Sequence, residues 1–91
     1  MALQPDDVIV RKETYASRVK DDLVFFNEAA GQYFATGPVG ADIWELIESP
    51  HSLRDICAAL MERYEVDEAT CLLEAQRFVE ELVAAGLATR D

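Results

Sequence analysis

Histidine and cysteine are scarce in this chain, and their scarcity excludes several kinds of site. The 91 residues contain one histidine, His51, and two cysteines, Cys57 and Cys71. A structural zinc site needs about four Cys or His ligands at close spacing, and the sequence has no such set. Each cysteine lies on the apolar side of a helical pattern, so we expect both to pack as small hydrophobic residues. We expect no metal and no cofactor.

Basic residues are also few. Eight Lys and Arg residues stand against 18 Asp and Glu residues, which gives a formal net charge of −10. Proteins that bind nucleic acid hold its phosphates with clustered Lys and Arg. The charge therefore argues against nucleic acid as a partner. It is compatible with a surface that only keeps the domain soluble, and with one that attracts a basic or neutral partner.

Long apolar runs are missing as well. The longest uncharged runs, such as residues 29–41, are too short and too rich in Gly and polar residues to span a membrane. Residues 1–7 lack the basic and apolar regions of a signal peptide. We therefore expect a cytoplasmic protein that has no contact with a membrane. The length suits one domain, residues 1–91, and a hydrophobic share of 51% is enough for one small core.

The first third of the chain has the pattern of β-strands. Apolar and polar residues alternate over residues 15–19, and residues 23–26 are rich in β-branched and aromatic side chains. A five-residue loop, 27–31, would lead to a returning strand at 32–36. The short connections predict three antiparallel strands.

The rest of the chain has the pattern of three helices. The first begins at Pro38, the second is capped by Ser52, and the third is capped by Asp67 and ends at Gly86. Three strands followed by three helices predict a small α+β domain. A pair of helices joined by a short turn beside a small sheet is typical of a winged helix-turn-helix.

Catalysis finds little support in the sequence. Ser52 follows His51 directly, and adjacent residues at a helix start point in different directions, so they do not form a nucleophile and its base. The acidic pairs Asp6-Asp7 and Glu80-Glu81 have no apolar pocket that would raise a pKa, so we expect them to be solvated. We expect that the protein is not an enzyme.

Two other classes of protein deserve comparison. A winged helix-turn-helix regulator would place a basic helix in the major groove, but the third helix carries four Glu residues against one Arg between residues 68 and 81. A carrier protein would attach phosphopantetheine to a Ser at a helix start. His51-Ser52-Leu53 resembles that motif with its Asp replaced, although the strands are wrong for a four-helix carrier.

The remaining interpretation uses the strand at residues 32–36. An edge strand presents unpaired N–H and C=O groups, and proteins usually protect such an edge with Lys or Pro. This strand carries no charge. If it lies at the edge beside the third helix, an extended peptide can add to it as a further strand. The alternative is that Tyr33 and Phe34 only fill the core and that the C-terminal tail caps the edge.

From Leu23 onward the chain resembles the PqqD-like family of leader-recognition elements, which serve ribosomally made, post-translationally modified peptides. The residues that carry the resemblance extend over about two-thirds of the chain: Asn27, Gly31-Gln32-Tyr33-Phe34, Gly40-Ala41-Asp42-Ile43-Trp44-Glu45-Leu46, Leu53-Arg54-Asp55-Ile56, Leu60, Tyr64-Glu65-Val66, Phe78-Val79-Glu80-Glu81-Leu82 and Gly86-Leu87. They are most similar to the stand-alone recognition proteins of lasso-peptide pathways. The start of the first helix, Thr36-Gly37-Pro38, departs from that pattern.

The resemblance implies a winged helix-turn-helix-like fold that does no chemistry. It implies that the leader of a precursor peptide binds as a strand beside the third strand and against the third helix. The domain would present the leader to a modifying enzyme, such as a leader peptidase or an ATP-dependent cyclase. The contacts on this sequence would be Gln32, Tyr33, Phe34, Ala35 and Thr36 in the strand, and Leu72, Gln76, Val79, Glu80 and Val83 on the helix.

Two further expectations concern charge and assembly. Glu80 and Glu28 are placed to select a basic residue of the leader. A strand edge without charged residues also permits two copies of the chain to pair as a homodimer.

Overall fold

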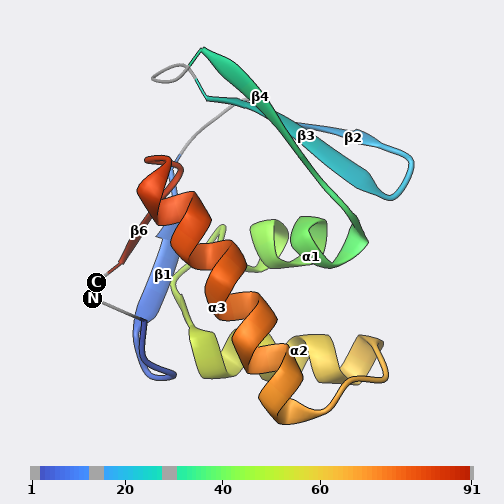
Figure 1. Cartoon of the computed structure of the whole chain (residues 1–91), viewed down its shortest axis with the longest axis vertical. Helices are drawn as coiled ribbons and strands as arrows, with labels where there is room; N and C mark the ends of the chain where they lie inside the picture. The colour runs from blue at the N-terminus through green and yellow to red at the C-terminus, as the bar shows by residue number, and fades with distance from the viewer. Residues whose placement is uncertain (1–2, 13–15, 28–30, 91) are drawn as a thin grey trace.

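The described residues of the computed structural model form six strands and three helices. It describes residues 3–12, 16–27 and 31–90, with Arg18, Asn27, Gln32 and Phe34 described by their backbone alone. The elements are β1 (Val8–Arg11), β2 (Ala16–Val19), β3 (Asp22–Asn27), β4 (Gln32–Thr36), α1 (Pro38–Leu46), β5 (His51–Ser52), α2 (Leu53–Arg63), α3 (Glu68–Ala84) and β6 (Ala88–Arg90). Figure 1 shows β2, β3 and β4 at the top, above α1, with β1 and β6 beside α3 at the left.

β2, β3 and β4 form an antiparallel sheet in that order, as the sequence predicts. Phe25 lies opposite Phe34, and Phe26 lies opposite Tyr33. Lys20, in the turn between β2 and β3, has a φ of 60°. Tight hairpin turns need positive φ because it matches the twist of the strands they join. The local connections therefore set the order of this sheet.

One face of this sheet packs on α1. Leu23 and Phe25 alternate along β3 and are 5% and 2% exposed. The rings of Phe25 and Trp44 are stacked, with centroids 4.8 Å apart and an angle of 7° between their planes. We call this covered side the inner face, and the opposite side the outer face. The inner face supplies the part of the core that fixes the sheet to the helices.

A second antiparallel sheet, which the sequence did not predict, has the order β5-β1-β6. Ile9 of β1 is fully buried and lies opposite both His51 and Arg90. The Nη1 atom of Arg11 donates to the carbonyl oxygen of Trp44 at 3.0 Å, and its guanidinium lies 5.1 Å from the centroid of that ring. The fold is thus α+β, with one more sheet than the three predicted strands provide.

The ends of α3 follow the predicted signals. The Asp67 carboxylate accepts a hydrogen bond from the backbone N–H of Thr70 at 3.0 Å. Hydrogen bonding with the Thr70 side chain, and then with its backbone, lowers the pKa of Asp67. At the other end Gly86 has a φ of 78°. The N–H groups of Gly86 and Leu87 donate to the carbonyls of Val83 and Leu82 at 3.1 and 2.8 Å, a Schellman motif.

The helices enclose the core and hold one another by polar contacts at its rim. The Tyr64 hydroxyl donates to a carboxylate oxygen of Asp42 at 2.6 Å, and Arg63 pairs with the same carboxylate at 3.1 Å. These contacts tie the end of α2 to α1. No helix in the described part of the chain is long and apolar enough to cross a membrane.

Candidate peptide-binding site

β4 lies at one edge of the β2-β3-β4 sheet. It pairs with β3 along its whole length, and no other strand within residues 3–12, 16–27 and 31–90 pairs with it. Alternate residues of such a strand direct their N–H and C=O groups away from the sheet. The other edge strand, β2, contains Arg18, whereas Gln32–Thr36 contains no charged residue. β4 is therefore the edge that lacks the usual protection.

The C-terminal tail does not cover this edge. Ala88–Arg90 forms β6, which pairs with β1 in the other sheet. Tyr33 is 76% exposed. The alternative is therefore wrong for Tyr33, which does not fill the core, and for Ala88–Arg90, which does not cap β4. For Phe34 it stays a prediction. The side chains of Gln32 and Phe34, which belong to the predicted contact set, lie outside what the structure describes.

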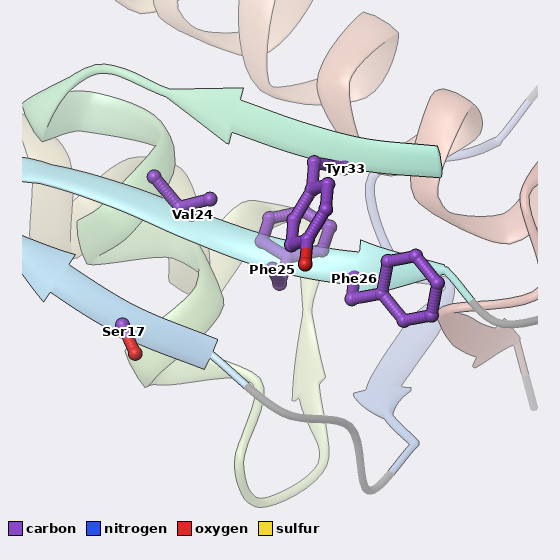
Figure 2. Close-up of a pocket in the computed structure, with 5 residues that line it drawn as sticks. All are labelled: Ser17, Val24, Phe25, Phe26 and Tyr33. Atoms are coloured by element: carbon purple, nitrogen blue, oxygen red, sulfur yellow. The ribbon is translucent and has the colours of Figure 1, made fainter. Parts of the chain in front are cut away.

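α3 lies on the open side of β4, as both Figure 1 and Figure 2 show. Four of the predicted helix residues are half-buried and share one side of α3, which we call the α3 flank: Leu72, Gln76, Glu80 and Val83. Leu72 and Val83 pack against the edge of the core. The fifth predicted residue, Val79, is fully buried, so its side chain holds α3 in place and does not reach the surface.

A hydrogen bond orders the polar part of the α3 flank. The Nε2 atom of Gln76 donates to a carboxylate oxygen of Glu80 at 3.0 Å, one turn along the helix. The carboxylate of Glu80 is thus held on the same side as Leu72 and Val83. Glu28, the other acidic residue predicted to select a basic partner, lies outside the described residues.

Leu73 adjoins the α3 flank, but the sequence-based prediction of contact residues did not include it. Its side chain is 56% exposed and adds apolar surface beside the flank. Residues three and seven positions apart share one side of a helix, so Leu73 lies next to Gln76 and Glu80. An apolar residue outside the core stripe was the signal that could have identified it.

The outer face of the sheet also carries exposed apolar side chains. A shallow depression of about 290 Å³ is lined by Ser17, Val24, Phe25, Phe26 and Tyr33. Figure 2 draws these five side chains. The rings of Phe26 and Tyr33 lie 4.9 Å apart at an angle of 49°. Tyr33 belongs to the predicted site, whereas Val24 and Phe26 do not. The alternation of residues along a strand assigns each residue to one of two faces of the sheet. It does not determine which face the helices cover.

A family model described as coenzyme PQQ synthesis protein D (PqqD) matches residues 22–88. The chain belongs to the PqqD family. The match runs from the first residue of β3 to the first residue of β6, so the PqqD segment contains β4, all three helices and the α3 flank. The resemblance inferred from the sequence is confirmed. No curated protein matches the chain.

The PqqD fold is also found in a solved structure, that of TbiB1 in complex with the TbiA(beta) leader peptide. The two chains superpose with a TM-score of 0.73 at 24% sequence identity, over 97% of this chain and 94% of that one. The shared fold thus extends beyond the PqqD segment to nearly the whole chain.

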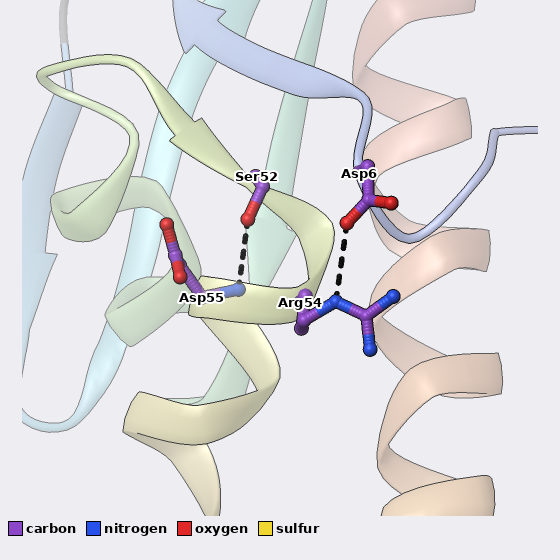
Figure 3. A network of polar contacts seen from close by, with 4 residues as sticks. All are labelled: Asp6, Ser52, Arg54 and Asp55. Carbon is purple, nitrogen blue, oxygen red and sulfur yellow. Dashed lines mark hydrogen bonds and ion pairs between the residues drawn. The ribbon is translucent and has the colours of Figure 1, made fainter.

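Ser52 has a structural role in this PqqD domain. Figure 3 shows its Oγ accepting a hydrogen bond from the backbone N–H of Asp55 at 3.0 Å, so it caps α2 as predicted. Its backbone lies in β5, opposite Val8. Beside it the Nε atom of Arg54 donates to Asp6 at 3.1 Å and ties α2 to the N-terminal segment. The cap accounts for a serine at this position without a phosphopantetheine group.

The two cysteines of the PqqD segment are buried free thiols between α2 and α3. The Sγ atom of Cys71 lies 3.9 Å from the carbonyl oxygen of Cys57. Burial, with a further contribution from Cys71, raises the pKa of Cys57 from 9.0 to about 12. The thiolate is the reactive form, so Cys57 is unreactive at neutral pH. No group of three metal-ligating side chains occurs among the described residues.

Proposed function

We propose that this chain binds the leader segment of a ribosomally made precursor peptide and presents it to a modifying enzyme, without catalysing a reaction itself. The observation that carries the proposal is the open, charge-free edge of β4, with α3 on its open side. Membership of the PqqD family supports it. So does the shared fold with TbiB1, which was solved with a leader peptide bound.

In this proposal the leader adds to β4 as a further strand of the sheet. Hydrogen bonds to the outward N–H and C=O groups of Gln32–Thr36 supply sequence-independent affinity. Side chains on the inner side of the leader meet Leu72 and Val83, and polar ones meet Gln76 and Glu80. Ordering a flexible leader costs conformational entropy, so contacts with the α3 flank are needed to make binding favourable.

Holding the leader changes the reaction that follows, although the domain does no chemistry. A tethered substrate meets an enzyme bound to the same domain at an effective concentration in the millimolar range for a short flexible connection. The partner enzyme would be a leader peptidase or a cyclase, as the resemblance to lasso-peptide recognition proteins implies. We place the reaction in the cytoplasm, where a precursor peptide is made.

Amide hydrogen exchange tests the strand addition. Linear peptides are selected from a display library on the immobilised protein, and the exchange of each β4 amide is measured by NMR with and without the best binder, here called the selected peptide. We expect the outward amides of Gln32–Thr36 to exchange at least about tenfold more slowly in the complex, because each gains a backbone partner. Protection of β2 instead, or of neither edge, would contradict the proposal. Sedimentation at several concentrations separates peptide binding from pairing of two copies through β4.

A DNA-binding regulator is the second candidate, because a three-stranded sheet beside the α2–α3 pair is the arrangement of a winged helix-turn-helix, a relation we propose for this fold. The exposed side of α3 carries Glu68, Glu74 and Glu81 against Arg77. With a net charge of −10, the protein is expected to leave labelled duplex DNA unshifted in a gel at about 0.1 M salt. A shift that weakens as salt rises would favour the regulator.

A further inference from the structure

The outer face of the β2-β3-β4 sheet is apolar although the core does not use it. Val19 and Tyr33 are 57% and 76% exposed, and Val24 and Phe26 are half-buried between them. Among the described residues of this face the one carboxylate is Asp22, at the end of β3 away from Tyr33. Within residues 16–27 and 31–36, the outer face thus has no carboxylate beside the rings of Phe26 and Tyr33.

The most exposed of these side chains stands on the edge strand itself. Tyr33 belongs to β4, and its ring lies 4.9 Å from that of Phe26 on β3 (Figure 2). The inner side of β3 is closed, because Phe25 stacks on Trp44. Phe26 and Tyr33 therefore form an exposed aromatic surface on the outer face, next to the open edge of the sheet. We call this surface the aromatic ledge.

A strand added at β4 must place side chains on this ledge as well as on the inner side. Successive side chains of a strand point to opposite faces, so alternate residues of an added strand reach the outer face. The one directly beside Tyr33 would have its Cβ about 5 Å from that of Tyr33. Aromatic and β-branched side chains are the best neighbours for an aromatic residue at such a position.

We propose that the leader is read on both faces of the sheet, and that Tyr33, supported by Phe26, selects an aromatic or β-branched leader side chain on the outer face. The inference rests on the proposed strand addition and names the kind of leader that the site accepts. A single leader side chain occupies the surface formed by Tyr33 and Phe26. The leader's backbone, bound at β4, places that side chain beside Tyr33. Tyr33 is a specificity-determining residue in this proposal.

Parallel selections from the display library of linear peptides test this role. Peptides are selected on the wild-type protein, on Tyr33→Lys and on Val19→Lys. Val19 is the matched control because it is exposed on the same face but lies on β2, at the far edge of the sheet. Both substituted side chains are mainly solvent-exposed, so both variants are expected to fold.

We expect wild-type and Val19→Lys selections to share an aromatic or β-branched residue at one position of the peptide. Tyr33→Lys should replace it with Asp or Glu, because opposite charges pair across neighbouring strands. The selected peptide should bind Tyr33→Lys roughly three- to tenfold more weakly than wild type. It should bind Val19→Lys with unchanged affinity.

Two contrary results have different meanings. If Tyr33→Lys selects the same residues as wild type while the peptide still protects the β4 amides, the strand addition holds and the role of Tyr33 is refuted. If the selected peptides leave the β4 amides unprotected, the proposed strand addition is refuted. The proposed selection of a leader side chain by Tyr33 is then refuted as well, because it depends on strand addition.

Discussion

Val83→Glu is expected to weaken binding of the selected peptide by about 30-fold or more while the protein stays folded. Val83 lies on the α3 flank, half-buried at the edge of the core and one turn from Glu80. Full burial of a valine contributes about 1.5–3 kcal/mol, so covering the exposed part of Val83 contributes about 1 kcal/mol, and each 1.4 kcal/mol changes affinity tenfold. The substitution removes that contribution and places a second carboxylate under the bound strand.

The matched control is Thr70→Glu, which adds the same charge on the side of α3 away from Leu72 and Val83. Thr70 is exposed, and an acidic residue is favourable in the first turn of a helix. Its substitution should change affinity by less than about twofold, because surface changes away from contacts are nearly neutral. Titration calorimetry measures the affinities, and thermal unfolding verifies that Val83→Glu is folded. Equal affinity of a folded Val83→Glu and the wild type would remove α3 from the site.

Gly40→Ala is expected to destabilise the protein by about 2–3 kcal/mol, which is the opposite of the change that helix propensity gives. Gly40 is buried in α1, where alanine would favour the helix by up to about 1 kcal/mol. A Cβ added there would lie 2.8 Å from Cβ of Thr36 and closer still to its hydroxyl. Overpacking of this kind costs typically 1–3 kcal/mol, so the midpoint of thermal unfolding should fall by about 10 °C.

Gly37, three residues earlier, is the internal control. A Cβ added to Gly37 meets no atom within 4 Å, and Gly37 caps α1 without a side-chain hydrogen bond. Gly37→Ser should therefore be neutral or stabilising, since serine is a better cap. Thr36→Gly should recover much of the stability lost in Gly40→Ala, because the two side chains compete for one space. Stability of Gly40→Ala equal to that of wild type would show that β4 and α1 separate easily.

The elements that the sequence predicted correctly are those with local signals. The hairpin pattern is enough for β2, β3 and β4, and Asp67 and Gly86 mark the two ends of α3 through hydrogen bonds to residues a few positions away. β1 was not predicted as a strand, because its partners are β5 and β6, far along the chain. Neither partner has a turn that joins it to β1.

The candidate site was predictable in part for a similar reason. The absence of charge in Gln32–Thr36 is visible in the sequence, and so is the wide apolar side of α3. Val79 belongs by helical spacing both to the core stripe and to the predicted contact set, and only packing decides such a boundary position in favour of the core. Phe25 and Phe26 are equally apolar, and only the stacking of Phe25 on Trp44 determines which of them is left outside.

The pairing of β1 with β6 determines how the domain can be joined to other proteins. Ile9 and Arg90 are opposite each other, so the first and last strands run side by side in a sheet that does not contain β4. A domain whose first and last strands are neighbours can be inserted into a surface loop of a carrier protein or fixed to a support at β1 or β6. Neither attachment involves β4, so a domain that binds peptides as proposed would serve as a genetically insertable module for capturing them.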